Sequence, residues 1–469
     1  MNTGSAKKNL TDGRLLPKII LFSLPLVATG MLQMFFHAAD TVVVGRWGGS
    51  TPEECENALA AVGSCGSLIN LIVNFFMGLS VGASVCAAQG IGARNRDAVQ
   101  KVVHTSVLAA MICGVFIALA GMIFAKPLLG LMGTDPAVID QAALYMRAFF
   151  FGTPASMIYN YCAGILRSDG DTKHPLIFLT VAGIVNVLLN LLTVLAFGLG
   201  AVGVGIATAA SHWVSCALVI LHLRRREGYC NLSLRSLRIH RQTLAQMIRI
   251  GVPAGVQSVV FSFSNVLLQS AINSFGKTVV AAYTAATNIG NFIYIAQNAF
   301  YHSTITFVGQ NLGARKYDRI GRSVFYSAIC ATVVGGLLGV SAAVFSKPLL
   351  GIYMPNSAQG LPYGVVYGWC VYALYFICGV MEVGTGLLRG LGKSLFSMLV
   401  SVFGVCGLRV LWIFTVFAHY SKILPPERAF FVLLLSYPIT WTITAIANYV
   451  IGFVLLKRIK KQENQAWLR

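Results

Sequence analysis

The sequence has few charged residues, and acidic ones are the scarcest. Asp, Glu, Lys and Arg make up 11% of its 469 residues, whereas soluble domains average roughly 25%. Asp and Glu together number 15, against 35 Lys and Arg, while hydrophobic residues reach 56%. A soluble chain of this length would need a charged surface to enclose its core, and these residues are too few to provide one. The composition therefore indicates a protein embedded in a membrane.

Long apolar segments take the place of the missing charge. Each is about 20 residues or longer, which is enough for a helix to cross the hydrocarbon core of a bilayer. We interpret the following segments as helices: 19–44, 59–81, 102–124, 144–165, 176–197, 201–223, 244–272, 279–301, 323–345, 363–387, 395–417 and 430–456. They predict an all-α polytopic membrane protein with twelve transmembrane helices.

An internal repeat groups these helices into two sets of six. The stretch FAKPLLGLM at Phe124 recurs as FSKPLLGIY at Phe345, and GILRSDG recurs as GLLRGLG at almost the same spacing. Paired motifs at a nearly constant spacing indicate a duplication. We predict two pseudo-symmetric six-helix bundles, with domains at 1–223 and 244–469 and a basic linker at 224–243.

The basic residues determine the orientation of the chain in the membrane and do not indicate a nucleic-acid-binding surface. The formal net charge is +20, but a nucleic-acid site would need a basic patch with exposed aromatics on a soluble domain. Lys and Arg instead gather in alternate loops and at both ends, for example at 224–226 and 457–461. This positive-inside pattern predicts two cytoplasmic termini. We expect a multi-pass protein of the plasma membrane, here a bacterial inner membrane, with the lipid bilayer as a partner and no nucleic acid.

The cysteines do not form a recognisable metal or disulfide pattern. There are 11, an odd number, and no CxxC pair occurs among them. Neither a disulfide framework nor a zinc site is indicated by such spacing. We therefore predict buried free thiols, no metal ligands and no cofactor.

Two carboxylates, Asp40 and Glu382, are the only acidic residues within predicted helices. An ionised carboxylate at the centre of a bilayer costs about 2.5–3.5 kcal/mol, so it is normally protonated, paired or turned toward water. Asp40 is either an interfacial anchor paired with Arg46 or a functional group inside the protein. Glu382 either pairs with Arg389 near the helix end or serves the second lobe.

The helix predicted at 176–197 offers partners for Asp40. Asn186 and Asn190, in GIVNVLLNLL, are spaced i, i+4 and therefore project from one face. From the helix start, a rise of about 1.5 Å per residue puts both in the half of the bilayer that Asp40 occupies. The three side chains could accept a proton or surround a small cation. Alternatively, each Asn forms an ordinary hydrogen bond to another helix.

The repeat shows that this polar trio belongs to one lobe. With Pro25 aligned to Pro253, Asp40 corresponds to Leu268. With GILRSDG aligned to GLLRGLG, the two asparagines correspond to Leu408 and Trp412. A structural role would be expected in both lobes, so the asymmetry favours ion chemistry in the first lobe alone.

Several motifs resemble those of the multidrug and toxic compound extrusion (MATE) family. They are AADTVVVGRWGG at the end of the first helix, the GILRSDGDT and GLLRGLGKS turns, and the QGIGARN and QNLGARK pair. The resemblance covers nearly the whole chain and is closer to the DinF-type branch. It implies a secondary antiporter that exports organic cations or drugs by alternating access, in exchange for protons or sodium.

The resemblance also implies roles for individual residues. The acid of the family's first helix matches Asp40, and the proline at which that helix bends matches Pro25. The DinF-type branch has an Asn and an Asp four residues apart in its fifth helix, where this chain has Asn186 and Asn190. One carboxylate fewer favours protons over sodium as the coupling ion. The family's acid in the tenth helix corresponds only loosely to Glu382.

The rest of the expected site is a substrate cavity. We expect it to be lined by Gln33, Met34, His37, Tyr159 and Glu382, and to accept small apolar organic cations in a monomeric protein. A lipid-linked oligosaccharide flippase of the same superfamily is an alternative, although such proteins carry a strongly basic cavity. An intramembrane enzyme is a further alternative, since His37 and Asp40 form an HxxD pair that could begin a metal site. Such a site needs matching ligands on other helices, and none are visible in the sequence. We therefore expect a transporter and not an enzyme.

Overall fold

The computed structural model describes residues 10–354 and 359–467, and within these ranges it contains helices and no strands. The predicted all-α class is therefore confirmed. In the first half the helices are α1 Leu15–Trp47, α2 Pro52–Gly92, α3 Arg96–Leu131, α4 Ile139–Phe151, α5 Thr153–Ser168, α6 Lys173–Asn190 and α7 Gly200–Arg225. A π-helical segment, η1 Leu191–Ala196, continues α6, and a 3₁₀ turn, η2 Leu234–Ser236, follows α7.

The second half repeats this order with more interruptions. Its helices are α8 Arg241–Asn273, α9 Lys277–Gly313, α10 Tyr317–Val344, α11 Ser346–Tyr353, α12 Leu361–Tyr367, α13 Tyr375–Gly390, α14 Ser394–Ser401, α15 Leu408–Trp412, α16 Ala418–Tyr420, α17 Pro426–Leu434 and α18 Ser436–Trp467. The π-helical segments η3 Gly368–Tyr372, η4 Val402–Gly407 and η5 Ile413–Phe417 lie between them.

The described chain has ten helices long and apolar enough to cross a membrane, or up to eleven when a pair bent by 41° between Tyr372 and Tyr375 is counted as one span. The twelve predicted segments agree with this count, except that the fourth is split into α4 and α5. Pro154 stands in the first turn of α5, where its missing N–H costs nothing. In the repeat alignment, the break at Gly152 corresponds to Leu374, one of the two residues between η3 and α13.

The repeated motif after α2 and after α9 produces the same turn twice. Arg94 and Arg315, which occupy equivalent places in GARN and GARK, both adopt left-handed backbone angles, with φ of 54° and 58°. Such angles are uncommon for residues other than glycine. The duplication read from the sequence is therefore visible in the backbone conformation.

The chain forms two compact units. The N-terminal unit is Ala28–Gly251, and the C-terminal unit combines the described residues up to Val27 with those from Val252 onward. This division differs from the predicted domains at 1–223 and 244–469, because the first half of α1 packs with the second repeat. Ile19 and Phe22 are buried in the same cluster as Phe307 and Leu387.

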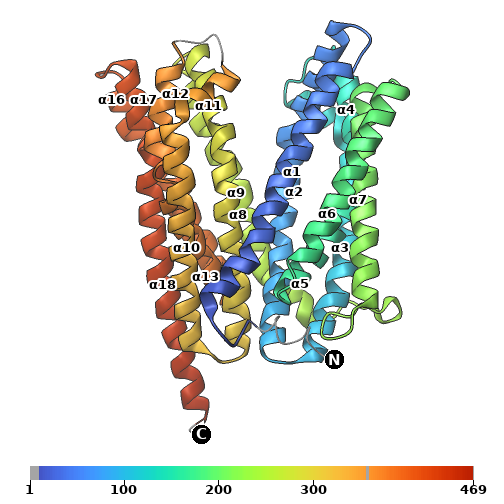
Figure 1. The fold of residues 1–469 in the computed structure, drawn as a ribbon, viewed down its shortest axis with the longest axis vertical. Helices are drawn as coiled ribbons and strands as arrows, with labels where there is room; N and C mark the ends of the chain where they lie inside the picture. The colour runs from blue at the N-terminus through green and yellow to red at the C-terminus, as the bar shows by residue number, and fades with distance from the viewer. Residues whose placement is uncertain (1–9, 355–358, 468–469) are drawn as a thin grey trace. The chain divides into compact units, whose positions relative to one another are not determined.

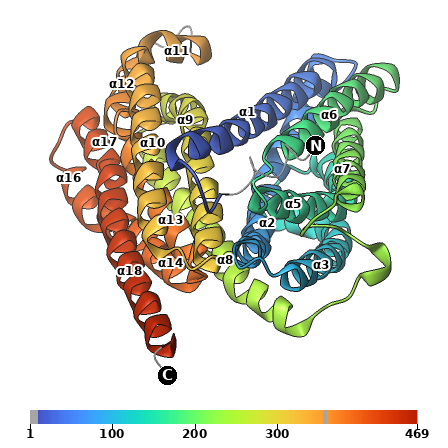
Figure 2. The same cartoon turned by 60° about the horizontal axis from the view of Figure 1, so that its bottom comes forward.

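Within the N-terminal unit, α2, α3 and α5 pack against one another, as Figure 2 shows. Helices α6 and α7 run side by side (Figure 1). Within the C-terminal unit, α13 contacts α9, α10 and α18 (Figure 1). Most of the cysteines are buried, and all eleven are free thiols in the structure.

The segment predicted as a basic linker at 224–243 packs against α3. The backbone N–H of Ser233 donates to Nε2 of His104 at 3.2 Å, and that of His240 donates to the Thr105 hydroxyl at 3.2 Å. Leu232 is buried with the core of the N-terminal unit. The linker is therefore part of that unit rather than a free tether.

Candidate functional site

The predicted polar trio comes together in the N-terminal unit. Nδ2 of Asn190 in α6 donates to Oδ1 of Asp40 in α1 at 2.5 Å, and also lies 3.3 Å from Oδ1 of Asn186. The amide of Asn186 in turn donates to the hydroxyl of Thr208 in α7 at 3.4 Å. Asn186 and Asn190 are buried, whereas Asp40 is half-buried. The result is a polar chain that crosses three helices and ends at a partly accessible carboxylate.

The ring of Phe36 in α1 lies directly against Gly183 in α6. A Cβ at Gly183 in α6 would lie 1.8 Å from the ring of Phe36 in α1, so only glycine leaves room for the ring. Phe36 precedes Asp40 by one helical turn, and Gly183 precedes Asn186 by three residues, so all lie along the same contact. The contact of Phe36 with Gly183 places the Asp40 carboxylate next to the amide of Asn190.

The backbone changes its winding directly after Asn190. From Leu191 the helix continues as the π-helix η1, and the N–H of Phe197 bonds to the carbonyl of Leu192 at 3.1 Å. Thr193 provides hydrogen bonds at this change of winding, since its hydroxyl donates to the carbonyls of Leu189 and Gly203 at 2.8 and 3.0 Å. Short π-helical segments within α-helices are frequent at functional sites.

The amide of Asn190 suits both charge states of Asp40. Its N–H donates to the carboxylate, while its buried Oδ1 has no hydrogen-bond partner among the described residues. A rotated amide would present that oxygen to a protonated acid, whose O–H is a donor. The same oxygens could contact a sodium ion, although Asp40 would be the one negative ligand of the trio.

Comparison with known proteins identifies the family of this chain. The family model described as MatE matches residues 25–192 and 253–415, one match in each repeat. The chain belongs to the MatE family. The family resemblance read from the motifs is confirmed, whereas the DinF-type branch stays a prediction.

The relatives of this MatE chain include named transporters. It is 28% identical over 412 residues to "Probable multidrug resistance protein YoeA" of Bacillus subtilis (strain 168), covering 86% of this chain and 87% of that protein. It is 24% identical over 450 residues to the "FAD transporter" of Shewanella oneidensis, covering 94% and 95%. A solved structure titled "Outward-facing conformation of a multidrug resistance MATE family transporter of the MOP superfamily" has the same fold. That match has a TM-score of 0.88 at 22% identity and covers 98% of this chain and 99% of that one.

These findings make the protein a multi-pass membrane transporter of small molecules and not an enzyme. The predicted functional class is thereby confirmed at this level. The coupling ion, the charge of the substrate and the roles of single residues are proposals.

The alternatives for the two membrane carboxylates can be weighed against the contacts in this MatE chain. Asp40 contacts Asn190, and within the described ranges no ion pair joins it to Arg46. Arg389 donates to the hydroxyl of Tyr301 and to Oε1 of Gln257, the latter at 2.8 Å. Among the described residues no ion pair joins Arg389 to Glu382, which is itself buried in α13. Among the described residues, the two carboxylates therefore do not form the direct ion pairs considered from the sequence.

The other predicted residues occupy different surroundings. Gln33 and His37 are exposed on α1 and Met34 is half-buried, while Pro25 lies inside the continuous helix α1. Tyr159 is buried, and its hydroxyl donates to the carbonyl of Pro175 at 2.9 Å. This hydroxyl holds α5 against the start of α6, and the cavity-lining role of Tyr159 stays a prediction.

A buried cation in the C-terminal unit was not predicted as part of a site. Arg409 in α15 is 4% exposed, and its Nη1 donates to Oδ1 of Asn265 in α8 at 3.4 Å. The guanidinium lies over the ring of Tyr437, 4.4 Å from its centroid, and the Tyr437 hydroxyl is 2.9 Å from that of Tyr283. Within the described ranges no carboxylate forms an ion pair with Arg409. Its position inside a predicted helix was the only signal in the sequence.

Proposed function

We propose that this protein exports organic cations or drugs from the cytoplasm in exchange for protons, and that Asp40 carries the proton. The observation that supports this proposal is the polar chain from Asp40 through Asn190 to Asn186, which exists in one repeat only. A carboxylate within a membrane-spanning helix is by default a functional group. A duplicated bundle architecture is typical of alternating access.

In the proposed cycle, the charged and neutral forms of Asp40 favour different states. The carboxylate accepts the Asn190 amide and attracts a cationic substrate. A proton from outside removes this charge and with it the attraction. Rotation of the Asn190 amide would then let its oxygen accept the new O–H. Loss of the charge also changes the packing of α1 against α6, because the two helices meet at this hydrogen bond.

The driving force limits what one proton can achieve. Entry down 100 mV and one pH unit releases about 2.3 plus 1.4 kcal/mol. Export of one monovalent cation against the same potential consumes about 2.3 kcal/mol. The remaining 1.4 kcal/mol corresponds to roughly tenfold accumulation, whereas a neutral substrate could reach several hundredfold. We therefore expect modest gradients for permanently charged cations.

A second candidate substrate class is an anionic aromatic compound. Arg409 supports it, because a buried guanidinium without a carboxylate partner in the described chain suits an anion. One relative of similar length is named as a transporter of FAD, whose phosphates are anionic. Asp40 would couple transport in either case, so the two candidates differ in the substrate and not in the ion.

Reconstitution tests the proposal. Purified protein in proteoliposomes should move a fluorescent organic cation when a pH gradient is imposed, and a sodium gradient of equal size should have no effect. Transport driven by sodium alone would contradict proton coupling. Faster transport of an anionic aromatic compound such as FAD than of the cation would favour the second candidate.

We further propose a monomer in the plasma membrane with both termini in the cytoplasm. In Cys55→Ser protein, a membrane-impermeant thiol reagent should label Glu53→Cys in intact cells and leave Lys461→Cys unlabelled. Labelling of Lys461→Cys would reverse the orientation. A mass measurement of the detergent-solubilised protein tests the monomer.

A further inference from the structure

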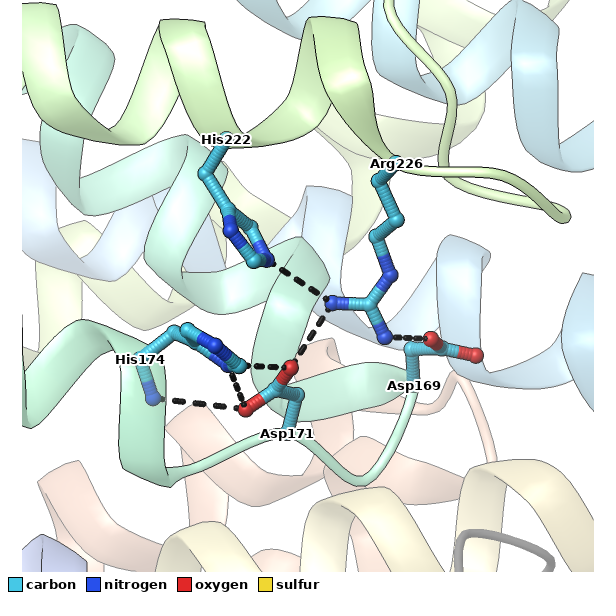
Figure 3. A network of polar contacts seen from close by, with 5 residues as sticks. All are labelled: Asp169, Asp171, His174, His222 and Arg226. Atoms are coloured by element: carbon cyan, nitrogen blue, oxygen red, sulfur yellow. Dashed lines mark hydrogen bonds and ion pairs between the residues drawn. The ribbon is translucent and has the colours of Figure 1, made fainter. Parts of the chain in front are cut away.

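A second polar cluster lies in the N-terminal unit, where the turn between α5 and α6 meets the end of α7. It contains Asp169, Asp171, His174, His222 and Arg226, and Figure 3 shows their side chains converging. Asp169 and Asp171 belong to the turn, His174 to the first turn of α6, and His222 to the last turn of α7. This cluster has no part in the transport mechanism proposed above.

Three of these residues present metal-ligand atoms toward one another. One carboxylate oxygen of Asp171 and one ring nitrogen from each of His174 and His222 all lie within 4.8 Å of one another. Nδ1 of His174 is 2.9 and 2.8 Å from the two oxygens of Asp171. The two imidazole rings face each other, with centroids 4.2 Å apart and planes at 32°.

These separations are close to those of a zinc site. Bonds of about 2.0–2.2 Å to nitrogen and oxygen in a tetrahedron put neighbouring ligand atoms about 3.4 Å apart. The present ligands would therefore move by about 1 Å or less. Imidazole suits Zn²⁺ and similar transition metals, whereas Mg²⁺ prefers oxygen and water. Two histidines and one carboxylate leave the fourth position for water, as in open zinc sites.

We propose that Asp171, His174 and His222 form a binding site for Zn²⁺. The metal would take the place of the proton between His174 and Asp171. It would also engage Nε2 of His222, which now lies 3.4 Å from Nη1 of Arg226. The site is open on one side, because the His174 side chain is 40% exposed while that of Asp171 is 3% exposed.

Arg226 competes with the metal for Asp171. Its Nη1 donates to Oδ2 of Asp171 at 2.8 Å, and its Nη2 pairs with Oδ2 of Asp169. An arginine guanidinium is always charged in proteins, and when the metal binds, that of Arg226 would keep Asp169 as its partner.

A bound ion would join the start of α6 to the end of α7. Helix α6 carries Asn186 and Asn190, and α7 carries Thr208, so the metal would fix the base of the two helices that form the polar chain. The expected effect is a more rigid N-terminal unit and higher resistance to heat.

The test is titration of the purified full-length protein in detergent with Zn²⁺, followed by calorimetry and by thermal unfolding. We expect one Zn²⁺ per chain and an increase in the unfolding temperature that Mg²⁺ does not produce. His174→Ala and His222→Ala should each weaken Zn²⁺ binding by at least about 10–100-fold. That is the loss observed when a residue that only hydrogen-bonds to a metal ligand is removed. His174 and His222 are both only partly buried, so we expect the two variants to fold. His419→Ala, at an exposed histidine of the C-terminal unit, serves as the control.

Arg226→Gln gives the sharper result, because it removes the competing cation and should tighten Zn²⁺ binding by tenfold or more, the size of one charge interaction in a partly solvated site. The proposal is wrong if the two histidine variants bind Zn²⁺ like the unmodified protein. It is also wrong if the unmodified protein binds no Zn²⁺, or if Arg226→Gln weakens binding.

Discussion

The two repeats use the same pair of segments for opposite charges. In the N-terminal unit, the first segment supplies Asp40 and the fifth supplies Asn190. In the C-terminal unit, the corresponding segments supply Asn265 and Arg409. One contact holds a carboxylate beside an amide, and the other holds a guanidinium beside an amide and a tyrosine ring. The same two segments therefore meet through polar groups in both units, but at residues that do not correspond in the repeat alignment and with charges of opposite sign.

The backbone of the two fifth segments diverged less than the side chains. A π-helix begins directly after Asn190, and another begins directly after Trp412, its counterpart. The indole of Trp412 donates to the carbonyl of Val432 at 2.9 Å, a packing contact where Asn190 contacts a carboxylate. The π-helix that follows this position is thus shared by the two repeats, and the polar chemistry is specific to each unit.

The largest expected effect comes from Asp40→Asn. Asn keeps the size and hydrogen-bonding groups of the side chain but cannot release a proton, so accumulation against a gradient should fall to background. Expression and thermal stability should remain normal. Transport into proteoliposomes with an imposed pH gradient measures the loss.

Glu382→Gln is the matched control, because it removes the membrane carboxylate of the other unit. It should leave the response to the pH gradient intact. If the two variants lose coupling equally, the distinction between the units has no mechanistic meaning.

Gly183→Ala should be the next most damaging change. The new Cβ would overlap the Phe36 ring, and overpacking of this kind typically costs about 1–3 kcal/mol. It should also separate Asp40 from Asn190 and reduce transport. The double variant with Phe36→Ala should recover transport in part, because the smaller side chain makes room for the methyl group. A double variant no better than Gly183→Ala would show that this contact does not position the carboxylate.

Asn190→Ala should shift the pH dependence of transport rather than abolish transport. The variant loses an N–H donor to the carboxylate, which disfavours the charged form. The pH of half-maximal transport should therefore rise, by about one unit for a charged hydrogen bond of ordinary strength. Trp412→Ala, at the matching position, should change packing and leave the pH profile where it was. Equal shifts from both variants would remove the functional difference between the repeats.

The smallest effect is expected from Arg409→Met. The cation–π contact with Tyr437 contributes about 0.5–2 kcal/mol, but burial of the charge opposes it, and apolar replacements of buried charges are often neutral. Thermal stability should change by about 1 kcal/mol or less, while the preference between cationic and anionic substrates shifts toward cations. Arg409→Lys keeps the charge and should keep the preference. A large loss of stability in Arg409→Met would assign Arg409 to the fold and not to the substrate.

The sequence predicted those features that depend on local spacing. Apolar runs and paired motifs gave the helices and the duplication, and the i, i+4 spacing gave the shared face of Asn186 and Asn190. Their contact with Asp40 followed because depth along a membrane helix can be estimated from residue number.

Features that depend on partners far away in the sequence could not be predicted from it. Nothing near Ile19 indicates that it packs with Phe307, and nothing near Asp171 indicates that His222 lies beside it. Asp171 also contacts the first turn of α6, since its Oδ1 accepts the backbone N–H of His174 at 3.3 Å. The hydrogen bond of Tyr159 could not be predicted for the same reason, because its partner is the carbonyl of Pro175 on another helix.

The association of the first part of α1 with the C-terminal unit has a consequence for biosynthesis. Leu15, Ile19 and Phe22 leave the ribosome early, but the residues that bury them, Phe307, Leu387 and Leu456, are made late. During most of translation these apolar side chains have lipid or a chaperone as neighbours in place of their final partners. Completion of α18 is therefore the step that lets the beginning of the chain reach its native packing.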